Sequence, residues 1–562
     1  MYKYLKRTIF FLLCFSVSNI RPEGLWNLDK RKERRDKAKK IRNVVAKLEA
    51  DTTHLHPQDT NGDLHRYANH MGSFSKNLSH NTSGSFKGFV KDPSFQSLLD
   101  ALKSGKSHKF DEIILGTTTP GHRRLTDPQA AYAFSLEGKD AAAPTMPAVP
   151  KLASAEAASE MVELYWMALL RDVPFDQYGT DASAQDAVTD LNNMSDFRGP
   201  KITNLVTDQT LFRGITPGEL DGPYISQFFY QPIPDHGKLV EQKYFGYKTG
   251  PGTDFLTSFN TGPTGTTWLE SQNGVSPSPA TPLFNSNATY IHTGRDLGTY
   301  IHKDTPGEAF FNAAFILFRW ASIDPNVLDD NHPYKMDPTQ EGFVSYGIVE
   351  MSYLLGVALE TAMKAAWYQK WLVHLRPRPE FLGFLAAIQT AGAAGIPLHS
   401  DLINSTGLAD TNTTFGSYLL PQMYPEGSPT HPAYPSGHAT IAGACTTILK
   451  AFFNESYILD SSTFQPKKPD STGANLLDYN DTTLSIGDEL NKLATNCGMG
   501  RNFAGIHYRT DCIEGMLLGE KIAISILKEE GFLKNSNFQG FSLTKFNGET
   551  ITIGKKQTVS LD

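Results

Sequence analysis

Three short segments combine cationic, imidazole and helix-start residues of the kind that bind an oxyanion. They are Lys370-Trp-Leu-Val-His-Leu-Arg-Pro-Arg378-Pro379, His431-Pro-Ala-Tyr-Pro-Ser436-Gly437-His438 and Arg501-Asn-Phe-Ala-Gly-Ile-His507-Tyr-Arg-Thr-Asp511. The planar guanidinium of arginine suits bidentate contact with an oxyanion, and lysine adds a mobile point charge. Together the three segments predict one site for an oxyanion.

In the first segment, Lys370 falls in the last turns of a long apolar helix that Pro377 and Pro379 terminate. Arg378, just past the end of this helix, can converge with Lys370 on one anion. Alone, this pattern fits an ordinary charged helix end equally well. Because helix positions rotate by about 100° per residue, Arg376 points elsewhere, and we expect it to lie outside the first ring of contacts or at the surface.

The second segment precedes apolar residues at helical spacing, namely Ile441, Cys445, Ile448 and Phe452. This spacing predicts a helix with Ser436 as its N-cap. Gly437 lets the backbone approach a ligand closely, and the free amides of a helix start attract anions. Ser436 either caps the helix or donates its hydroxyl to the anion.

In the third segment, Arg501 adds a positive charge six residues before His507. His507 and Asp511 are four residues apart, so they share one face of a helix or its first turn. Asp511 can hold one ring nitrogen and leave the other as a metal ligand or a nucleophile. A single His–Asp pair is more often structural, so the prediction depends on all three segments together.

In this order, Lys-(seven residues)-Arg-Pro, Pro-Ser-Gly-His and Arg-(five residues)-His-(three residues)-Asp resemble the vanadium-dependent haloperoxidases and their phosphatase relatives in the type 2 phosphatidic acid phosphatase superfamily. The step from Lys370 to Arg378 is longer than in the phosphatases and looks like the algal bromoperoxidase branch. The segments ELYWMALLRDVPF (163–175), LFRGITPGELDGPYISQFF (211–229) and GIHYRTD (505–511) are also similar to that branch. The resemblance covers about residues 100 to 530.

The resemblance implies a role for each matching residue. His507 would bind vanadium through a ring nitrogen, and Asp511 would orient it from behind. The groups implied to hold the vanadate oxygens are Lys370, Arg378, Ser436, the amide of Gly437 and Arg501. His438 would be the acid–base residue, and Lys370 would polarise the peroxide. Trp367 and His431 would shape the halide side, although a core tryptophan and a loop histidine are the ordinary alternatives.

The resemblance also implies the reaction, in which bromide or iodide is oxidised by hydrogen peroxide to hypohalous acid, which halogenates organic acceptors. Vanadate is the implied cofactor, and three cations would offset the cost of burying it. The main alternative is a phosphatase that acts through a phosphohistidine at His507. A second alternative is a secreted anion-binding or structural protein without catalysis. Homo-oligomers and bound calcium occur among the relatives, but no loop here has an EF-hand pattern.

Composition limits the class of protein. The 562-residue chain has a formal charge of -7, which argues against nucleic-acid binding. Lys3, Lys6 and Arg7 before the short apolar run 8–17 predict a secretory signal, with a buried first helix as the alternative. The protein is then secreted, and no later apolar stretch is long enough to span a membrane.

The resemblance and the helical periodicity predict a mainly α fold, with helical bundles of the haloperoxidase and acid phosphatase type, long loops and a small C-terminal β-hairpin. The expected parts are a signal peptide (1–20), a charged and polar extension (21–150), the helical core with the vanadate site (151–530) and the hairpin tail (531–562). Helices are expected after Ala153 and over 307–323, 342–375, 436–453 and 511–528, and a hairpin over 541–559. Cys445, Cys497 and Cys512 are either buried small hydrophobes or one disulfide with a spare thiol.

Overall fold

The chain forms two units, of which the larger carries all three predicted anion-binding segments. This computed structural model describes residues 28–52, 58–250, 253–259, 266–277, 284–460, 462–534 and 538–554. The first unit comprises residues 1–53 and 557–562, and the second comprises residues 54–556. In the first unit, the charged segment that includes residues 30–40 forms a helix, α2 (Leu28–Thr52). The predicted signal peptide lies outside the described residues.

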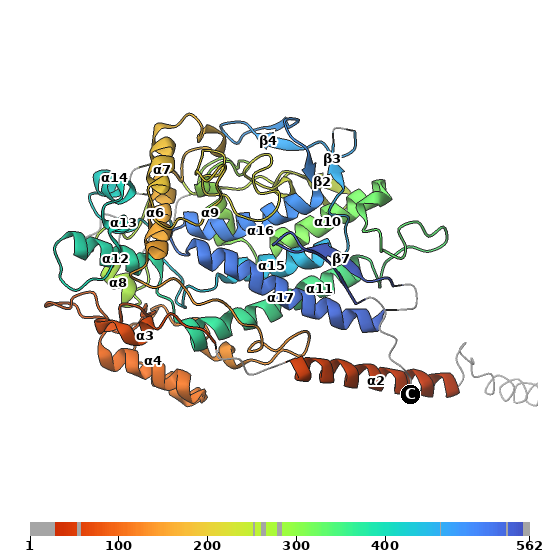
Figure 1. The fold of residues 1–562 in the computed structure, drawn as a ribbon, viewed down its shortest axis with the longest axis horizontal. Coiled ribbons are helices and arrows are strands. Elements are labelled where there is room, and N and C mark those ends of the chain that lie inside the picture. The colour runs from red at the N-terminus through yellow and green to blue at the C-terminus, as the bar shows by residue number, and fades with distance from the viewer. Residues whose placement is uncertain are drawn as a thin grey trace, which may run out of the picture. The chain divides into compact units, whose positions relative to one another are not determined.

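Four long helices form the centre of the larger unit (Figure 1). They are α11 (Ile348–Tyr368), α15 (Gly437–Lys450), α16 (Ile486–Phe503) and α17 (Arg509–Leu533). Helix α15 contacts the other three, and each of its residues except His438 is buried. The core is therefore built around a helix that begins at the second predicted segment.

Helices α15 and α17 approach each other with almost no side chain between them. A Cβ atom at Gly519 would lie 2.1 Å from the carbonyl oxygen of Thr440, and one at Gly443 would lie 2.1 Å from that of Met516. Any larger residue at these two positions would separate the helices. Because α15 begins at Gly437 and α17 begins two residues after His507, this close packing brings the second and third segments together.

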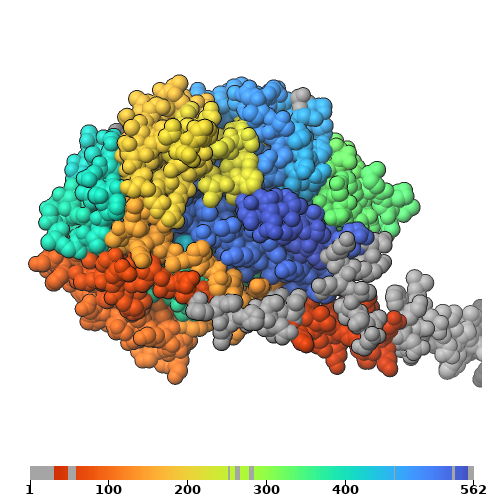
Figure 2. All heavy atoms as spheres, viewed as in Figure 1, coloured from red at the N-terminus to blue at the C-terminus, as the bar shows by residue number. Residues whose placement is uncertain are grey.

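The remaining helices of the larger unit surround the central four and range from 4 to 16 residues in length. They are α3 (Asp63–Arg66), α4 (Asp92–Ser104), α5 (Ser107–Asp111), α6 (Ala155–Leu169), α7 (Ala182–Asn192), α8 (Trp268–Gln272), α9 (Gly294–Lys303), α10 (Glu308–Ile323), α12 (Pro379–Thr390), α13 (Ser400–Ile403) and α14 (Thr406–Phe415). Single turns of 3-10 helix occur at Ala68–His70, Pro128–Tyr132, Phe175–Gln177, Gln227–Phe229 and Pro325–Val327. Long loops are present as predicted: the described parts of residues 195–293 are mostly loop, and they form much of the yellow surface in Figure 2.

The strands form four small antiparallel pairs. These are β1 (Ile233–Asp235) with β2 (Lys238–Val240), β3 (Ile458–Leu459) with β6 (Leu484–Ser485), β4 (Lys467–Pro469) with β5 (Leu476–Asp478), and β7 (Phe541–Thr544) with β8 (Thr550–Ile553). The last pair is the predicted C-terminal hairpin, and Gly548 in its turn has a φ of 84°. Residues 555–559 of that prediction lie outside the described residues.

The structure corrects some of the predicted helix limits. The helix expected over 342–375 begins at Ile348, and its last turns are a π-helix, Gln369–His374. Helix α16 was not predicted, because its sequence mixes Asn, Thr, Gly and Lys with apolar residues, whereas all of its positions except Asp488 are buried. Helix α4 was also missed, in a region where no sustained period was recognised.

Two further predictions concern the core and the membrane. Cys445, Cys497 and Cys512 are free and buried, as expected for small hydrophobic residues and not for a disulfide. Within the described part of the chain, no helix is both long and apolar enough to cross a bilayer.

Candidate active site

The first and second segments meet around the ammonium group of Lys370. Lys370 lies in the π-helical turn and is fully buried. Its Nζ donates to the carbonyl oxygens of Pro432 at 2.8 Å and Ala433 at 2.9 Å, and also to that of Pro435. Additional π-helical turns are common at functional sites, and this one holds the lysine against the loop that leads into α15.

Arg378 joins the first segment to the other two. It is the N-cap residue of α12 and is 2% exposed. One terminal guanidinium nitrogen donates to the carbonyl oxygen of Ile506 at 2.8 Å and lies 2.9 Å from Nε2 of His507. The other lies 3.0 Å from Nδ1 of His431, and Nε donates to the carbonyl oxygen of His431 at 2.8 Å. Arg378 therefore contacts residues of both other segments.

His507 is held from behind by Asp511, as the spacing predicts. Its Nδ1 lies 2.8 Å from a carboxylate oxygen of Asp511, which also accepts the amide of Tyr508 at 3.2 Å. Because a carboxylate accepts hydrogen bonds, Nδ1 carries the proton and Nε2 keeps its lone pair. Burial, followed by the charges of Arg378, Lys370 and Arg501, lowers the pKa of His507 well below its usual value. A neutral imidazole thus presents Nε2 to the cations.

The three cations have no counter-ion of their own. Among the described residues, no carboxylate lies within ion-pair distance of Lys370, Arg378 or Arg501. Burial and then the charge of Arg378 lower the pKa of Lys370 well below its usual value, and burial lowers the pKa of Arg378 to about 9. An isolated buried charge is costly, so this arrangement suits an anionic ligand.

Arg501 reaches the site from the end of α16 and is supported by an aromatic stack. It donates to the carbonyl oxygen of Ile301 at 3.2 Å, and its guanidinium carbon lies 5.4 Å from the ring centre of Tyr424. The ring of His302 stacks on that of Tyr424, with the ring centres 3.6 Å apart. Nε2 of His302 lies 2.8 Å from a carboxylate oxygen of Glu426. These supporting residues were not predicted, because nothing in their local sequence indicates a common contact.

Ser436 and Gly437 form the start of α15 beside the cations. The hydroxyl of Ser436 accepts the amide of Ala439 at 3.4 Å, which is a long capping contact. The amide of Ser436 donates to the carbonyl oxygen of Asp511 at 2.8 Å. A Cβ atom at Gly437 would lie 3.3 Å from the sulfur of Met363, so the first turn packs closely against α11.

His438 is the only α15 residue that is not buried, and it faces a carboxylate that the sequence analysis did not identify. Its Nε2 lies 3.5 Å from Asp304, the residue that follows α9. The side chain is 28% exposed, and its partial burial, followed by the charge of Arg501, lowers the pKa of His438, whereas Asp304 opposes this shift. The two residues are far apart in the chain, so only the fold could reveal that Asp304 is the partner of His438.

Trp367 and His431 lie together at the edge of the cation cluster. Their ring centres are 4.8 Å apart, and Nζ of Lys370 lies 5.8 Å from the centre of the Trp367 ring. Both residues are almost fully buried, and Trp367 also belongs to a hydrophobic cluster. Burial and then the charges of Arg378 and Lys370 lower the pKa of His431 well below its usual value. The structure thus places all ten predicted site residues in one region.

Comparisons with known proteins agree with this geometry. The family described as "VCPO second helical-bundle domain" matches residues 350–531. A vanadium-dependent bromoperoxidase of Ascophyllum nodosum is 34% identical over 94% of this chain and 94% of its own length, and one of Corallina officinalis is 31% identical over 88% and 92%. The structure of a homohexameric vanadate-dependent bromoperoxidase of A. nodosum superposes with a TM-score of 0.84 at 28% identity, covering 94% of this chain and 91% of that one. The chain belongs to the vanadium-dependent bromoperoxidase family.

Proposed function

We propose that this enzyme oxidises bromide or iodide with hydrogen peroxide at a vanadate ion held on His507. One halide ion, one peroxide molecule and one proton give one hypohalous acid and one water, and the hypohalous acid then halogenates organic acceptors. The observation that carries the proposal is a set of three buried cations without counter-ions around the lone pair of a neutral imidazole.

The residues of the site fit vanadate. Vanadate is an oxyanion, and the charges of Lys370, Arg378 and Arg501 offset the free-energy cost of removing it from water. Nε of Arg501 is buried and has no hydrogen-bond partner among the described residues, so a donor remains for a ligand oxygen. Nε2 of His507 would coordinate the metal, and the guanidinium of Arg378, which lies 2.9 Å from Nε2, would be available to hold the oxygens of the ion.

The start of α15 completes the binding site for the anion. The hydroxyl of Ser436 and the amide of Gly437 donate to the oxyanion, as amides at helix starts commonly do. When bound, vanadate supplies a Lewis acid that activates hydrogen peroxide without changing its own oxidation state. The positive charge of Lys370 would stabilise negative charge that develops on oxygen when the halide is oxidised, because electrostatic stabilisation is strong in a dry site.

His438 moves the proton. Its pKa is lowered, so the imidazole is neutral near pH 7 and can accept a proton from hydrogen peroxide. Nε2 faces Asp304, and Nδ1 is therefore the nitrogen that accepts this proton. The carboxylate of Asp304 orients the ring and stabilises its charged form. Trp367 and His431 bound the side from which the halide approaches.

A phosphatase would use the same site, with His507 as the nucleophile. The bromoperoxidase relatives favour the peroxidase over this alternative. The decisive experiment assays apo-protein for bromination of a phenol dye with each halide, with and without added vanadate, and for hydrolysis of a nitrophenyl phosphate. Vanadate-dependent bromination is expected. Phosphate ester hydrolysis without any vanadate-dependent bromination would contradict the proposal.

We also propose three further properties of the protein. The chain is a homo-oligomer, as is its A. nodosum neighbour, and light scattering of the purified protein tests this. It is secreted, and cleavage after the basic and apolar segment 1–20 would be seen by N-terminal sequencing of exported protein. Calcium binding is the third property; among the described residues no group of three or more His, Cys, Asp or Glu side chains is arranged to hold a metal ion.

A further inference from the structure

A buried ion-pair network lies behind His507, on the side away from the cations. We propose that Glu160 and Arg376 act as a positioning pair that sets the orientation of His507 and thereby the affinity of the site for vanadate. This inference rests on the proposed function, because it assumes that vanadate binds at His507.

Hydrogen bonds connect the pair to His507 without a gap. The two carboxylate oxygens of Asp511 have different partners: one lies 2.8 Å from Nδ1 of His507, and the other accepts from the guanidinium of Arg376 at 2.7 Å. A second terminal nitrogen of Arg376 donates to Glu160 at 2.7 Å. Because both carboxylates bind the same rigid guanidinium fork, a change at Glu160 is transmitted to Asp511.

Glu160 also holds the loop that carries His507. The amide and the hydroxyl of Thr510 both donate to its second carboxylate oxygen at 2.6 Å. The guanidinium of Arg376 lies over the ring of Tyr508 at 3.8 Å and donates to the hydroxyl of Thr510 at 2.7 Å. The residues that follow His507 are thus held by side chains from α6 and from the Arg-Pro-Arg loop.

Arg376 links this loop to the second segment as well. Its carbonyl oxygen accepts the amide of Ala433 at 3.0 Å, and the carbonyl oxygen of Asp511 accepts the amide of Ser436 at 2.8 Å. Burial by itself would lower the pKa of Arg376, but Glu160 and Asp511 raise it above the usual value. Arg376 therefore remains charged at the point where the three vanadate-binding segments meet.

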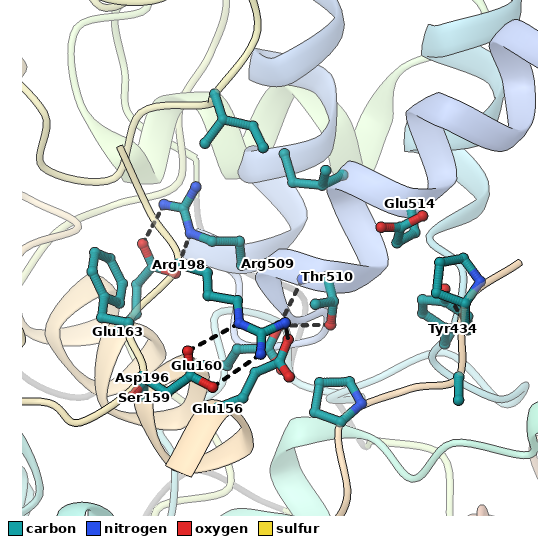
Figure 3. A pocket seen from close by; sticks show the side chains of 16 residues that line it. Glu156, Ser159, Glu160, Glu163, Asp196, Arg198, Tyr434, Arg509, Thr510 and Glu514 are labelled. Carbon is teal, nitrogen blue, oxygen red and sulfur yellow. Dashed lines mark hydrogen bonds and ion pairs between the residues drawn. The ribbon is translucent and has the colours of Figure 1, made fainter. Parts of the chain in front are cut away.

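Glu160 borders a cavity of about 200 Å³, which allows a conservative change to be accommodated. Figure 3 shows Glu160 next to Thr510, and Glu163, one turn further along α6, next to Arg509. Glu160 comes from a helix outside residues 350–531, the part that matches the helical-bundle family. Helix α6, which lies outside that matched bundle, therefore contributes to vanadate binding through Glu160.

The experiment compares Glu160→Gln with the matched control Glu163→Gln. Glu163 is also buried on α6 and pairs with an arginine, Arg509, but it does not contact Arg376 or Asp511. Apo-protein of each form is titrated with orthovanadate by equilibrium dialysis, and its thermal unfolding is measured. We expect Glu160→Gln to weaken vanadate binding by about tenfold or more, as is typical when a group that orients a metal ligand is lost. The control should bind within about twofold of the wild type, even where it unfolds at a lower temperature.

The outcomes separate the inference from the proposed function. If the wild type does not bind vanadate, the proposed function fails, and the inference fails with it. If the wild type binds but Glu160→Gln binds equally well, or Glu163→Gln is weakened as much, only the inference is overturned. Should Glu160→Gln not fold, Arg376→Lys replaces it, because lysine keeps the charge but cannot bind both carboxylates through a planar fork. The same loss of affinity is then expected, and unchanged affinity would overturn the inference.

Discussion

Buried cations lie on both sides of the His507 ring, but the two sides differ in their counter-ions. The side of Nε2 is called the front and the side of Nδ1, where Asp511 lies, the back. The front cations, Lys370, Arg378 and Arg501, have no carboxylate at ion-pair distance among the described residues. Each of the back cations, Arg376 and Arg509, is paired with a buried glutamate. Burial of a cation therefore does not by itself identify a ligand site, and at His507 it is the missing counter-ion that distinguishes the front from the back.

The pKa values separate the two sides in the same way. Burial lowers the pKa of Arg378 to about 9 on the front. On the back, burial would also lower the pKa of Arg509, but Glu163 raises it above the usual value. On the front, the buried charges destabilise the folded protein as long as no anion is bound. On the back, the paired glutamates already stabilise the buried charges.

The largest effect expected is the loss of activity when a front residue is removed. Lys370→Ala and His438→Ala should each lower bromination by about 100-fold or more, because the first removes transition-state charge stabilisation and the second removes the base. Circular dichroism should show a retained fold. The unfolding free energy of apo Lys370→Ala should fall by less than that of a back variant, because this change removes hydrogen bonds to carbonyl oxygens but leaves no buried carboxylate without its cation. Full activity of both variants would refute the roles assigned to them.

Removal of a back cation should act mainly on stability. Arg376→Ala leaves Glu160 and Asp511 buried without their cation, and such a loss typically costs about 3–5 kcal/mol. Urea unfolding of the apo-protein measures this value next to that of Lys370→Ala. Equal unfolding free energies for the two variants would remove the distinction between front and back.

Asp304 is a carboxylate on the front side, but it contacts His438 and not one of the front cations. Since Asp304 raises the pKa of His438, Asp304→Asn should lower that pKa further. The acidic limb of the pH profile for bromination should then move to lower pH, and the maximal rate should fall by about tenfold as the base weakens. An unshifted limb would argue that His438 is not the titrating base.

The smallest effect is expected for a change at Glu156, which lies on the back side near Glu160. Burial and then the charge of Glu160 raise the pKa of Glu156 from 4.5 to about 7. Between these values the folded state holds a proton that the unfolded chain has released, so stability falls as the pH rises through this window. Glu156→Gln should therefore gain about 1 kcal/mol at about pH 8 and nothing at about pH 4. Thermal unfolding at both pH values tests this, and a gain of equal size at both would contradict it.

The residues of the site and much of the helical fold could be predicted from the amino-acid sequence. Residue type and spacing were sufficient for Lys370, for the N-cap at Ser436 and for the His507–Asp511 pair, because each depends on contacts within a few residues or on one helix end. Helical periodicity likewise indicated α15 and α17, whose apolar positions recur at regular intervals.

The distant residues that support these motifs could be identified only from the packing of the folded chain. Asp304 meets His438, Tyr424 supports Arg501, and Glu160 meets Arg376 across long stretches of chain. Arg376 was expected either outside the first ring of contacts with the anion or at the surface. In the structure it is buried. Pairings of this kind depend on how helices pack and on which charges share a dry environment, and neither property is encoded in local spacing.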